Sequence, residues 1–114
     1  MNLSPIIESQ PFEIDNLNTF HSQIGRIKST LGLEFEQSSD VVPDVFTLGA
    51  ALPLTKTQWQ TFTAWITPLL AKESFVSAIQ VIPGHPSLSS SVLIQKDGTL
   101  TLRAIYPQPN QVSI

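Results

Sequence analysis

The sequence predicts an α+β domain in which two helices pack on a small, mainly antiparallel sheet that ends in a β-hairpin. Two observations predict it: two segments carry apolar residues at helical spacing, and several short β-rich runs include an Asp-Gly turn near the C-terminus. The 114 residues match the length of one ordinary domain. We place this single domain at residues 15–106, between an extended N-terminal arm, 1–14, and an extended C-terminal tail, 107–114.

Both terminal segments are expected to be extended. Pro5 and Pro11 disfavour helix in the arm, and the prolines of the tail favour a polyproline-like conformation. The apolar residues of the arm indicate that it packs either on its own domain, the interpretation we favour, or on a neighbouring subunit. The tail either bridges subunits, for example as a strand added to a neighbour's sheet, or belongs to the core of its own domain. The candidate interaction residues are Ile6, Ile7, Phe12, Trp65, Val112 and Ile114.

Apolar spacing predicts the first helix. Asp15 or Asn16 is a suitable N-cap and Gly32 a suitable left-handed stop. Between them, apolar residues recur at intervals of three and four, which places them on one stripe of a helix. A short coiled-coil seam would show the same stripe, but it needs more heptads than this segment holds, so we expect core packing. The stripe consists of Leu17, Phe20, Ile24, Ile27 and Leu31.

The second helix carries the clearest start signal in the chain. Thr55 and Gln58 fit a capping box, and Leu54 with Trp59 fits the hydrophobic staple that often accompanies it. Pro68 conflicts with an uninterrupted helix. Either the helix kinks there, or Thr67 caps a new turn with Pro68 at its first position, which is the alternative we favour. One of the two tryptophans, Trp59 and Trp65, is expected in the core, and the other at a rim or interface.

Three strands are expected before the hairpin. Residues 33–36 alternate in polarity, which predicts a short strand with one wet face, and residues 45–48 form a second strand that Gly49 ends. Residues 75–82 carry apolar side chains at both odd and even positions. A strand that is apolar on both faces is usually buried on both, so we expect it at the centre of the sheet.

The hairpin around Asp97-Gly98 has two possible registers. A two-residue turn pairs Lys96 with Thr99 and puts the apolar residues of the two strands on opposite faces. A three-residue loop pairs Gln95 with Thr99 and gathers the apolar residues on one face. Because a one-residue slip exchanges the faces, burial selects the three-residue loop, with Gly98 left-handed at a bulge. The shared apolar face then holds Val92, Ile94, Leu100, Leu102 and Ala104.

Composition excludes several function classes. The chain has no cysteine, which rules out disulfides and thiolate chemistry, and only 13% of its residues are charged. Its net charge is −3 and its six basic residues are scattered, so we expect no nucleic-acid partner. No apolar run approaches the ~20 residues of a membrane span, and the N-terminus is unlike a signal peptide. We therefore expect no membrane partner and a cytoplasmic location.

No catalytic or cofactor site is evident. His21 lies beside the apolar residues of the first helix, and His85 lies in a Pro-Gly-His-Pro loop without a strained nucleophile turn nearby. Glu34 and Glu36, with Asp40 and Asp44 after them, form an acidic edge but no calcium-loop pattern. Phosphate-binding glycine spacings are missing. We expect a non-enzymatic protein without metal or cofactor.

The segment from Ile94 to Leu102, Ile-Gln-Lys-Asp-Gly-Thr-Leu-Thr-Leu, resembles hairpins of phage tail, fibre and baseplate components. The cysteine-free, low-charge composition is similar to that of small virion accessory proteins of the tail, baseplate or decoration type. The resemblance implies a structural or interaction subunit of a larger, oligomeric assembly, with protein subunits as partners, and a location in the virion if a phage encodes the protein. The alternative is a small soluble inhibitor or adaptor that binds one protein partner.

Overall fold

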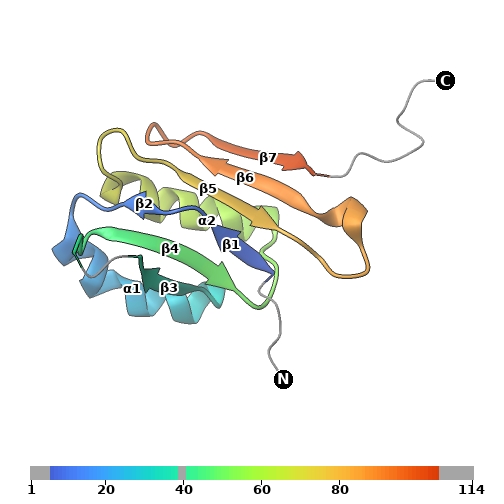
Figure 1. Cartoon of the computed structure of the whole chain (residues 1–114), viewed down its shortest axis with the longest axis horizontal. Coiled ribbons are helices and arrows are strands. Elements are labelled where there is room, and N and C mark those ends of the chain that lie inside the picture. Colours follow the sequence, from blue (N-terminus) through green and yellow to red (C-terminus); the bar gives the residue numbers. More distant parts are fainter. Residues whose placement is uncertain (1–5, 39–40, 106–114) are drawn as a thin grey trace.

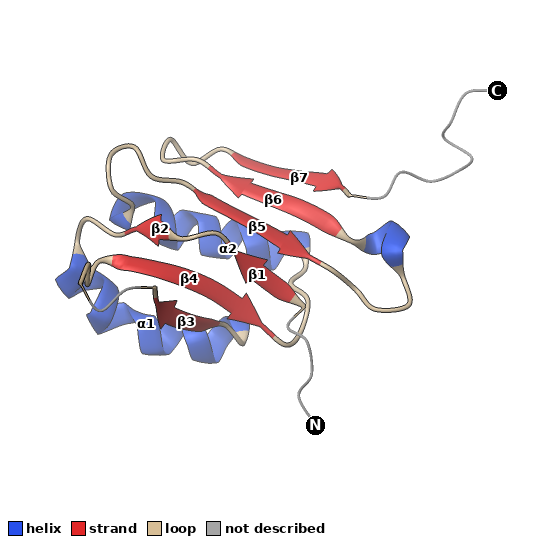
Figure 2. Cartoon of the chain, in the orientation of Figure 1, coloured by secondary structure: helices blue, strands red, loops and turns tan. Residues whose placement is uncertain are grey.

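An antiparallel sheet with two α-helices on one of its faces forms the fold (Figures 1 and 2). The computed structural model describes residues 6–38 and 41–105. Within them the helices are α1 (Leu17–Leu31) and α2 (Lys56–Ile66), and the strands are β1 (Ile7–Ser9), β2 (Phe12–Glu13), β3 (Glu34–Gln37), β4 (Val45–Ala50), β5 (Val76–Gln80), β6 (Ser90–Ile94) and β7 (Leu100–Ala104). The predicted α+β class is confirmed.

The sheet runs in the order β3, β4, β1, β5, β6, β7, with the short strand β2 continuing the course of β1 beside β4. The segments β1-α1-β3 and β4-α2-β5 are interleaved, so that β4 lies between β1 and β3, and β1 lies between β4 and β5. This is the split β-α-β arrangement. The hairpin β6–β7 extends it beyond β5, as Figure 1 shows.

The N-terminal segment is part of the sheet rather than an arm outside the domain. Ile7 pairs with Ala50 on one side and with Gln80 on the other, and its side chain is fully buried. Phe12 is also buried and pairs with Phe46. The boundary expected at residue 14 therefore does not separate an arm from a domain, and packing on its own domain is the correct alternative. The predicted tail, 107–114, lies outside the described residues.

Both helices begin as predicted. The Asn16 side chain accepts a hydrogen bond from the Thr19 N–H at 3.1 Å, and Gly32 ends α1 in the left-handed conformation, with φ 69°. In α2 the Thr55 hydroxyl oxygen accepts from the Gln58 N–H at 3.1 Å, and the Gln58 side chain accepts from the Thr55 N–H at 2.9 Å. The capping box is thus confirmed, because both halves of it are formed.

The end of α2 and the course of β4 differ in detail from the expectation. A short 3₁₀ helix, Thr67–Leu69, follows α2 directly and carries Pro68 near its start, but the Thr67 side chain does not cap it. Strand β4 runs through Gly49 to Ala50 instead of stopping. A Cβ at Gly49 would stand 3.5 Å from the Ile7 carbonyl oxygen of β1, which is an ordinary van der Waals distance, so this contact does not by itself require a glycine.

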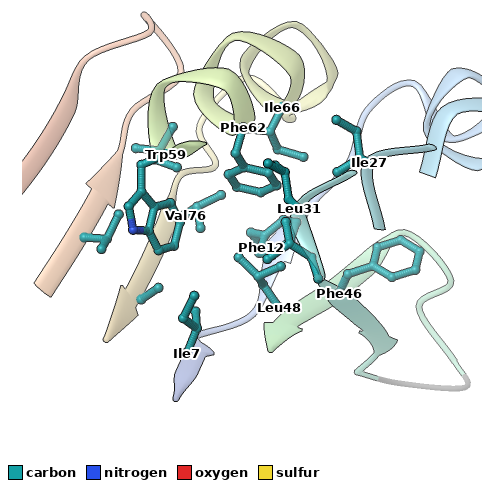
Figure 3. Close-up of a cluster of buried hydrophobic side chains, with 14 of the residues drawn as sticks. Ile7, Phe12, Ile27, Leu31, Phe46, Leu48, Trp59, Phe62, Ile66 and Val76 are labelled. Atoms are coloured by element: carbon teal, nitrogen blue, oxygen red, sulfur yellow. The ribbon is translucent and has the colours of Figure 1, made fainter. Parts of the chain in front are cut away.

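The core fills the space between the sheet and the two helices (Figure 3). Trp59 and Phe62 of α2 point into it, so Trp59 is the one of the two tryptophans that lies in the core. Gln80 is a buried polar residue within this core. Its carboxamide oxygen accepts from the Leu54 N–H at 2.9 Å and from the Trp59 indole N–H at 3.3 Å. Gln80 therefore ties the start of α2 to the middle of the sheet.

The hairpin adopts the three-residue loop. Ile94 pairs with Leu100, the Gln95 N–H donates to the Thr99 carbonyl at 2.9 Å, and Gly98 is left-handed with φ 94°. The predicted register and the predicted role of Gly98 are confirmed. Lys96 at the start of the loop donates to the carbonyl oxygens of Thr67 and Leu70, at 2.8 and 2.6 Å, and so links the hairpin to the end of the 3₁₀ helix.

We predict that Gln80→Met lowers the free energy of unfolding by about 2–4 kcal/mol, because it leaves two buried N–H donors without an acceptor while nearly preserving side-chain volume. Urea denaturation measures the change. Gln60→Met, on the exposed surface of α2, is the matched control and should shift stability by less than ~0.5 kcal/mol. Equal effects of the two substitutions would contradict the role assigned to Gln80.

A second prediction concerns Asp97 in the hairpin loop. Its carboxylate accepts from the Thr99 backbone N–H at 2.9 Å, and this bond, helped by the Thr99 side chain, lowers the pKa of Asp97. A lowered pKa in the folded state means that the ionised group stabilises the fold above its unfolded pKa, and that the contribution is lost as the pH falls through the folded pKa.

Asp97→Ala should therefore lower the melting temperature at neutral pH, and the difference from the wild type should shrink in acid. Thermal melts across the acidic range measure it. Asp97→Asn is the control, because its carboxamide oxygen still accepts the hydrogen bond but does not titrate. An Asp97→Ala difference that stays constant in acid would show that the carboxylate does not stabilise the loop.

Candidate functional site

The face of the sheet opposite α1 and α2, here called the open face, is not covered by any described element. Figure 1 views it directly, with both helices behind the sheet. Along β5 the side chains of Val76 and Ala78 are buried toward the helices. The alternate residues Phe75, Ile79 and Val81 remain 52%, 48% and 41% exposed. Side chains alternate between the two faces of a strand, so these three lie on the open face.

This finding corrects the prediction that residues 75–82 are buried on both faces. Strand β5 is central, as expected, because it lies between β1 and β6. It is buried on one face only, because both helices pack on the same side of the sheet. Leu93 of β6, opposite Ser77, extends the uncovered apolar area sideways. We call this group the apolar stripe: Phe75, Ile79, Val81 and Leu93.

Two shallow hollows lie along the stripe. One, of about 320 Å³, brings Phe75 and Leu93 together with Gln95 and with the lysines at positions 72 and 96. The other, of about 300 Å³, brings Ile79 and Val81 together with Glu8 of β1 and with Ile6, which directly precedes that strand. The open face therefore has a shallow hollow near each end of β5. Apolar surface with a polar rim is typical of protein-binding sites.

Carboxylates gather on the same face beside β4. Glu8 and Glu34 both pair with Gly49, one from each side, and Glu36 pairs with Thr47. The three glutamates line a hollow of about 510 Å³ whose floor is β4. Glu34 also forms an ion pair with Lys28 of α1 at 3.6 Å, and its side chain remains mostly exposed. The open face thus combines an apolar centre with a group of carboxylates beside β4. We call this group the acidic side: Glu8, Glu34 and Glu36.

The acidic residues do not make a metal centre. In residues 6–38 and 41–105, no three His, Cys, Asp or Glu side chains are grouped so that they could hold an ion. Glu34 and Glu36 lie on an edge strand, as expected, because β3 pairs only with β4 within the described sheet. Charges on such an edge deter strand-to-strand aggregation.

The structure separates the residues that the sequence suggested as interaction sites. Ile7 and Phe12 are buried in the core and are unavailable to a partner. Ile6 is half-buried at the rim of the hollow beside Val81. Val112 and Ile114 lie outside the described residues. Apolar character alone did not distinguish an inner strand from a docking segment, because both need the same residues.

Trp65 lies between the two helices. Its indole N–H donates to the Gln23 carboxamide oxygen at 2.8 Å, and its ring packs against Phe20 and Phe35, at centroid distances of 5.7 and 6.0 Å. It is half-buried, which agrees with the expected place at a rim. Its contacts within the chain show that it joins α1 to α2.

The two histidines lie in different surroundings. His21 is exposed on α1 and packs edge-on against Phe20 at 5.7 Å, whereas His85 is exposed in the turn after β5. Among the described side chains, neither imidazole hydrogen-bonds to a serine hydroxyl or to a carboxylate.

Within residues 6–38 and 41–105, no helix has the length and apolar character that crossing a bilayer requires.

No family model, curated protein or solved structure matches this chain. The chemistry of the open face indicates what it can bind. It offers apolar contact at the centre and carboxylates along one side, a combination that fits a protein surface with an apolar centre and basic residues. Residues 75, 79, 81 and 93 were visible in the sequence as apolar β positions, but their availability depends on where the helices pack.

We predict that Ile79→Ser changes the free energy of unfolding by less than about 1 kcal/mol, because the side chain is half-exposed. Ile94→Ser is the matched control on the neighbouring strand, where the same residue type is fully buried toward the helices. It should cost at least about 3 kcal/mol through the lost contacts and the buried hydroxyl. Urea denaturation compares them, and equal losses would show that the chain itself covers the open face.

Proposed function

We propose that this protein is a non-enzymatic subunit of a larger protein assembly and that the open face binds a neighbouring subunit. One observation carries the proposal: β5 has the two-sided apolar pattern of a strand covered on both faces, yet the described chain covers only one. A partner that packs on the apolar stripe would complete the burial that the sequence is patterned for.

The energetic gain from such packing is appreciable. Full burial of an Ile, Val or Phe side chain contributes about 1.5–3 kcal/mol, so covering side chains that are already half-buried adds roughly 1 kcal/mol each. The stripe therefore supplies the apolar centre of an interface. The acidic side would select partners that present Lys or Arg beside their apolar contact, because like charges there are repelled.

Two sequence features support the virion of a phage as the assembly. The hairpin segment Ile94–Leu102 resembles hairpins of phage tail and baseplate components, and the low charge of the chain is similar to that of small virion proteins. In this proposal the protein is an accessory part held by neighbours. A soluble inhibitor or adaptor with one partner is the alternative, and the test below separates the two.

The test is the size of the complex that the tagged protein forms in its source cells. The wild type should sediment with a particle far larger than its own 12.5 kDa, with other subunits identified by mass spectrometry. Ile79→Lys should release it, because a charge would be buried at the centre of the contact. Leu52→Lys is the control, since Leu52 is 70% exposed in the connection between β4 and α2.

Free wild-type protein in no complex would overturn the proposal. A single soluble partner at fixed stoichiometry would instead support the inhibitor or adaptor function. If the wild type and both variants sediment alike within the particle, the contact with the assembly is not made by the open face.

A further inference from the structure

Strand β7, the last within the described residues, forms an edge of the described sheet. It pairs with β6 on one side, and within residues 6–38 and 41–105 no strand pairs with its other side. The two edges of the sheet are not alike. The other edge strand, β3, carries two glutamates in four residues, whereas β7 carries one charge, Arg103, in five. An edge with few charges and without proline or a bulge is a template for pairing with another strand.

The hydrogen-bond pattern identifies which groups of β7 are available. The Gln95 N–H donates to the Thr99 carbonyl, and the Ile105 N–H donates to the Ser89 carbonyl. In an antiparallel ladder the direction alternates, so the odd residues 99–105 bond inward to β6. The N–H and C=O groups of Leu100, Leu102 and Ala104 therefore point away from the sheet.

The same three residues place their side chains on the helix side. Leu100 and Leu102 remain half-exposed, because α2 does not reach fully over β7. They form one wall of a groove of about 620 Å³, whose other wall is the α2 surface with Gln60, Thr63 and Ala64. A strand added to β7 would thus gain backbone hydrogen bonds and, on the same side, contact with two leucines.

We propose that β7 pairs antiparallel with β7 of a second copy of this chain, about a two-fold axis through Leu102. The three outward residues are evenly spaced about Leu102, so the strand is complementary to itself. Leu102 exchanges both hydrogen bonds with its counterpart, and Leu100 exchanges both with Ala104 of the second copy. Every outward N–H and C=O of these three residues then has a partner.

The side chains agree with this register. On the helix side, leucine meets leucine at the axis and leucine meets alanine beside it, which alternates large and small residues. On the open face, Thr101 lies opposite Arg103 of the second copy, so no like charges are directly opposed. A segment with blocks of one charge would be repelled from its own copy, whereas β7 has a single charge that falls off the axis. These features favour a second copy over an unrelated strand.

This proposal concerns a different surface from the apolar stripe and goes beyond the proposed function. In a pair of this kind the sheet continues from one copy into the next. The open faces of both copies then lie on the same side, and two apolar stripes are presented together.

The first test is the solution mass of the full chain by sedimentation equilibrium over a wide concentration range. The wild type should reach twice its 12.5 kDa. Ala104→Pro should raise the dimer dissociation constant at least about tenfold, because it removes an outward N–H that bonds only across the axis. It removes no bond within the monomer, so its urea denaturation under monomer conditions should match the wild type. Ala104→Ser keeps the N–H and is the matched control.

The second test uses the absence of cysteine from the chain. Thr101→Cys and Arg103→Cys are each oxidised alone and as a mixture. Opposed residues 101 and 103 have Cα atoms about 4.5 Å apart in this register, within the range of a disulfide. Two copies of residue 101 are separated by more than the ~7 Å limit. Only the mixture should give a disulfide-linked dimer.

A wild type that stays monomeric, a dimer unaffected by Ala104→Pro, or variants that cross-link as readily alone as mixed would each overturn the pairing. A monomer destabilised by Ala104→Pro would mean that the chain pairs with its own β7 and would overturn it too. A monomer that still joins a particle through Ile79 rejects only the pairing. A dimer that joins no particle rejects only the proposed function.

Discussion

The insertion of β1 between β4 and β5 is the contact on which the rest of the fold depends. Ile6 donates to the Ala50 carbonyl and accepts from the Val81 N–H, both at 2.8 Å, and Gln10 donates to the Ser77 carbonyl at the same distance. Without this strand the sheet would divide into β2–β4–β3 and β5–β6–β7. Because β1 pairs with strands far along the chain, these contacts close long loops, and their entropy cost slows folding. The core under Ile7 forms only when both halves meet.

Features with local causes were predictable from the sequence. The Thr55–Gln58 capping box, the left-handed stop at Gly32 and the three-residue hairpin loop each depend on residues a few positions apart. The place of β1 was not predictable in this way. Pro11 is compatible with an extended arm, yet it lies in the interruption between β1 and β2, where the ladder does not need its N–H. Which strands a segment pairs with is a long-range property.

The candidate site, too, was only partly predictable from the sequence. The apolar residues of 75–82 correctly indicated a central strand, but the sequence pattern does not say whether the second cover comes from the same chain. Ile7 and Ile79 are both isoleucines in central strands, and one is fully buried while the other is half-exposed. The difference arises only from α1 and α2 packing on one side. The open face is available because no described helix covers it, and no sequence motif marks such a surface.

The unequal edges of the sheet bear on how far pairing between copies can proceed. Strand β3 is short, and its glutamates 34 and 36 project on one face beside Glu8. A second strand brought to that edge would meet closely spaced carboxylates, whereas β7 presents leucine, threonine and alanine around a single arginine. Growth of the sheet by addition of further copies therefore has one permissive end. Once the β7 edges of two copies have paired, neither copy has another edge that favours pairing, and the assembly stops at a dimer. A sheet built this way avoids fibre formation without needing a closed barrel.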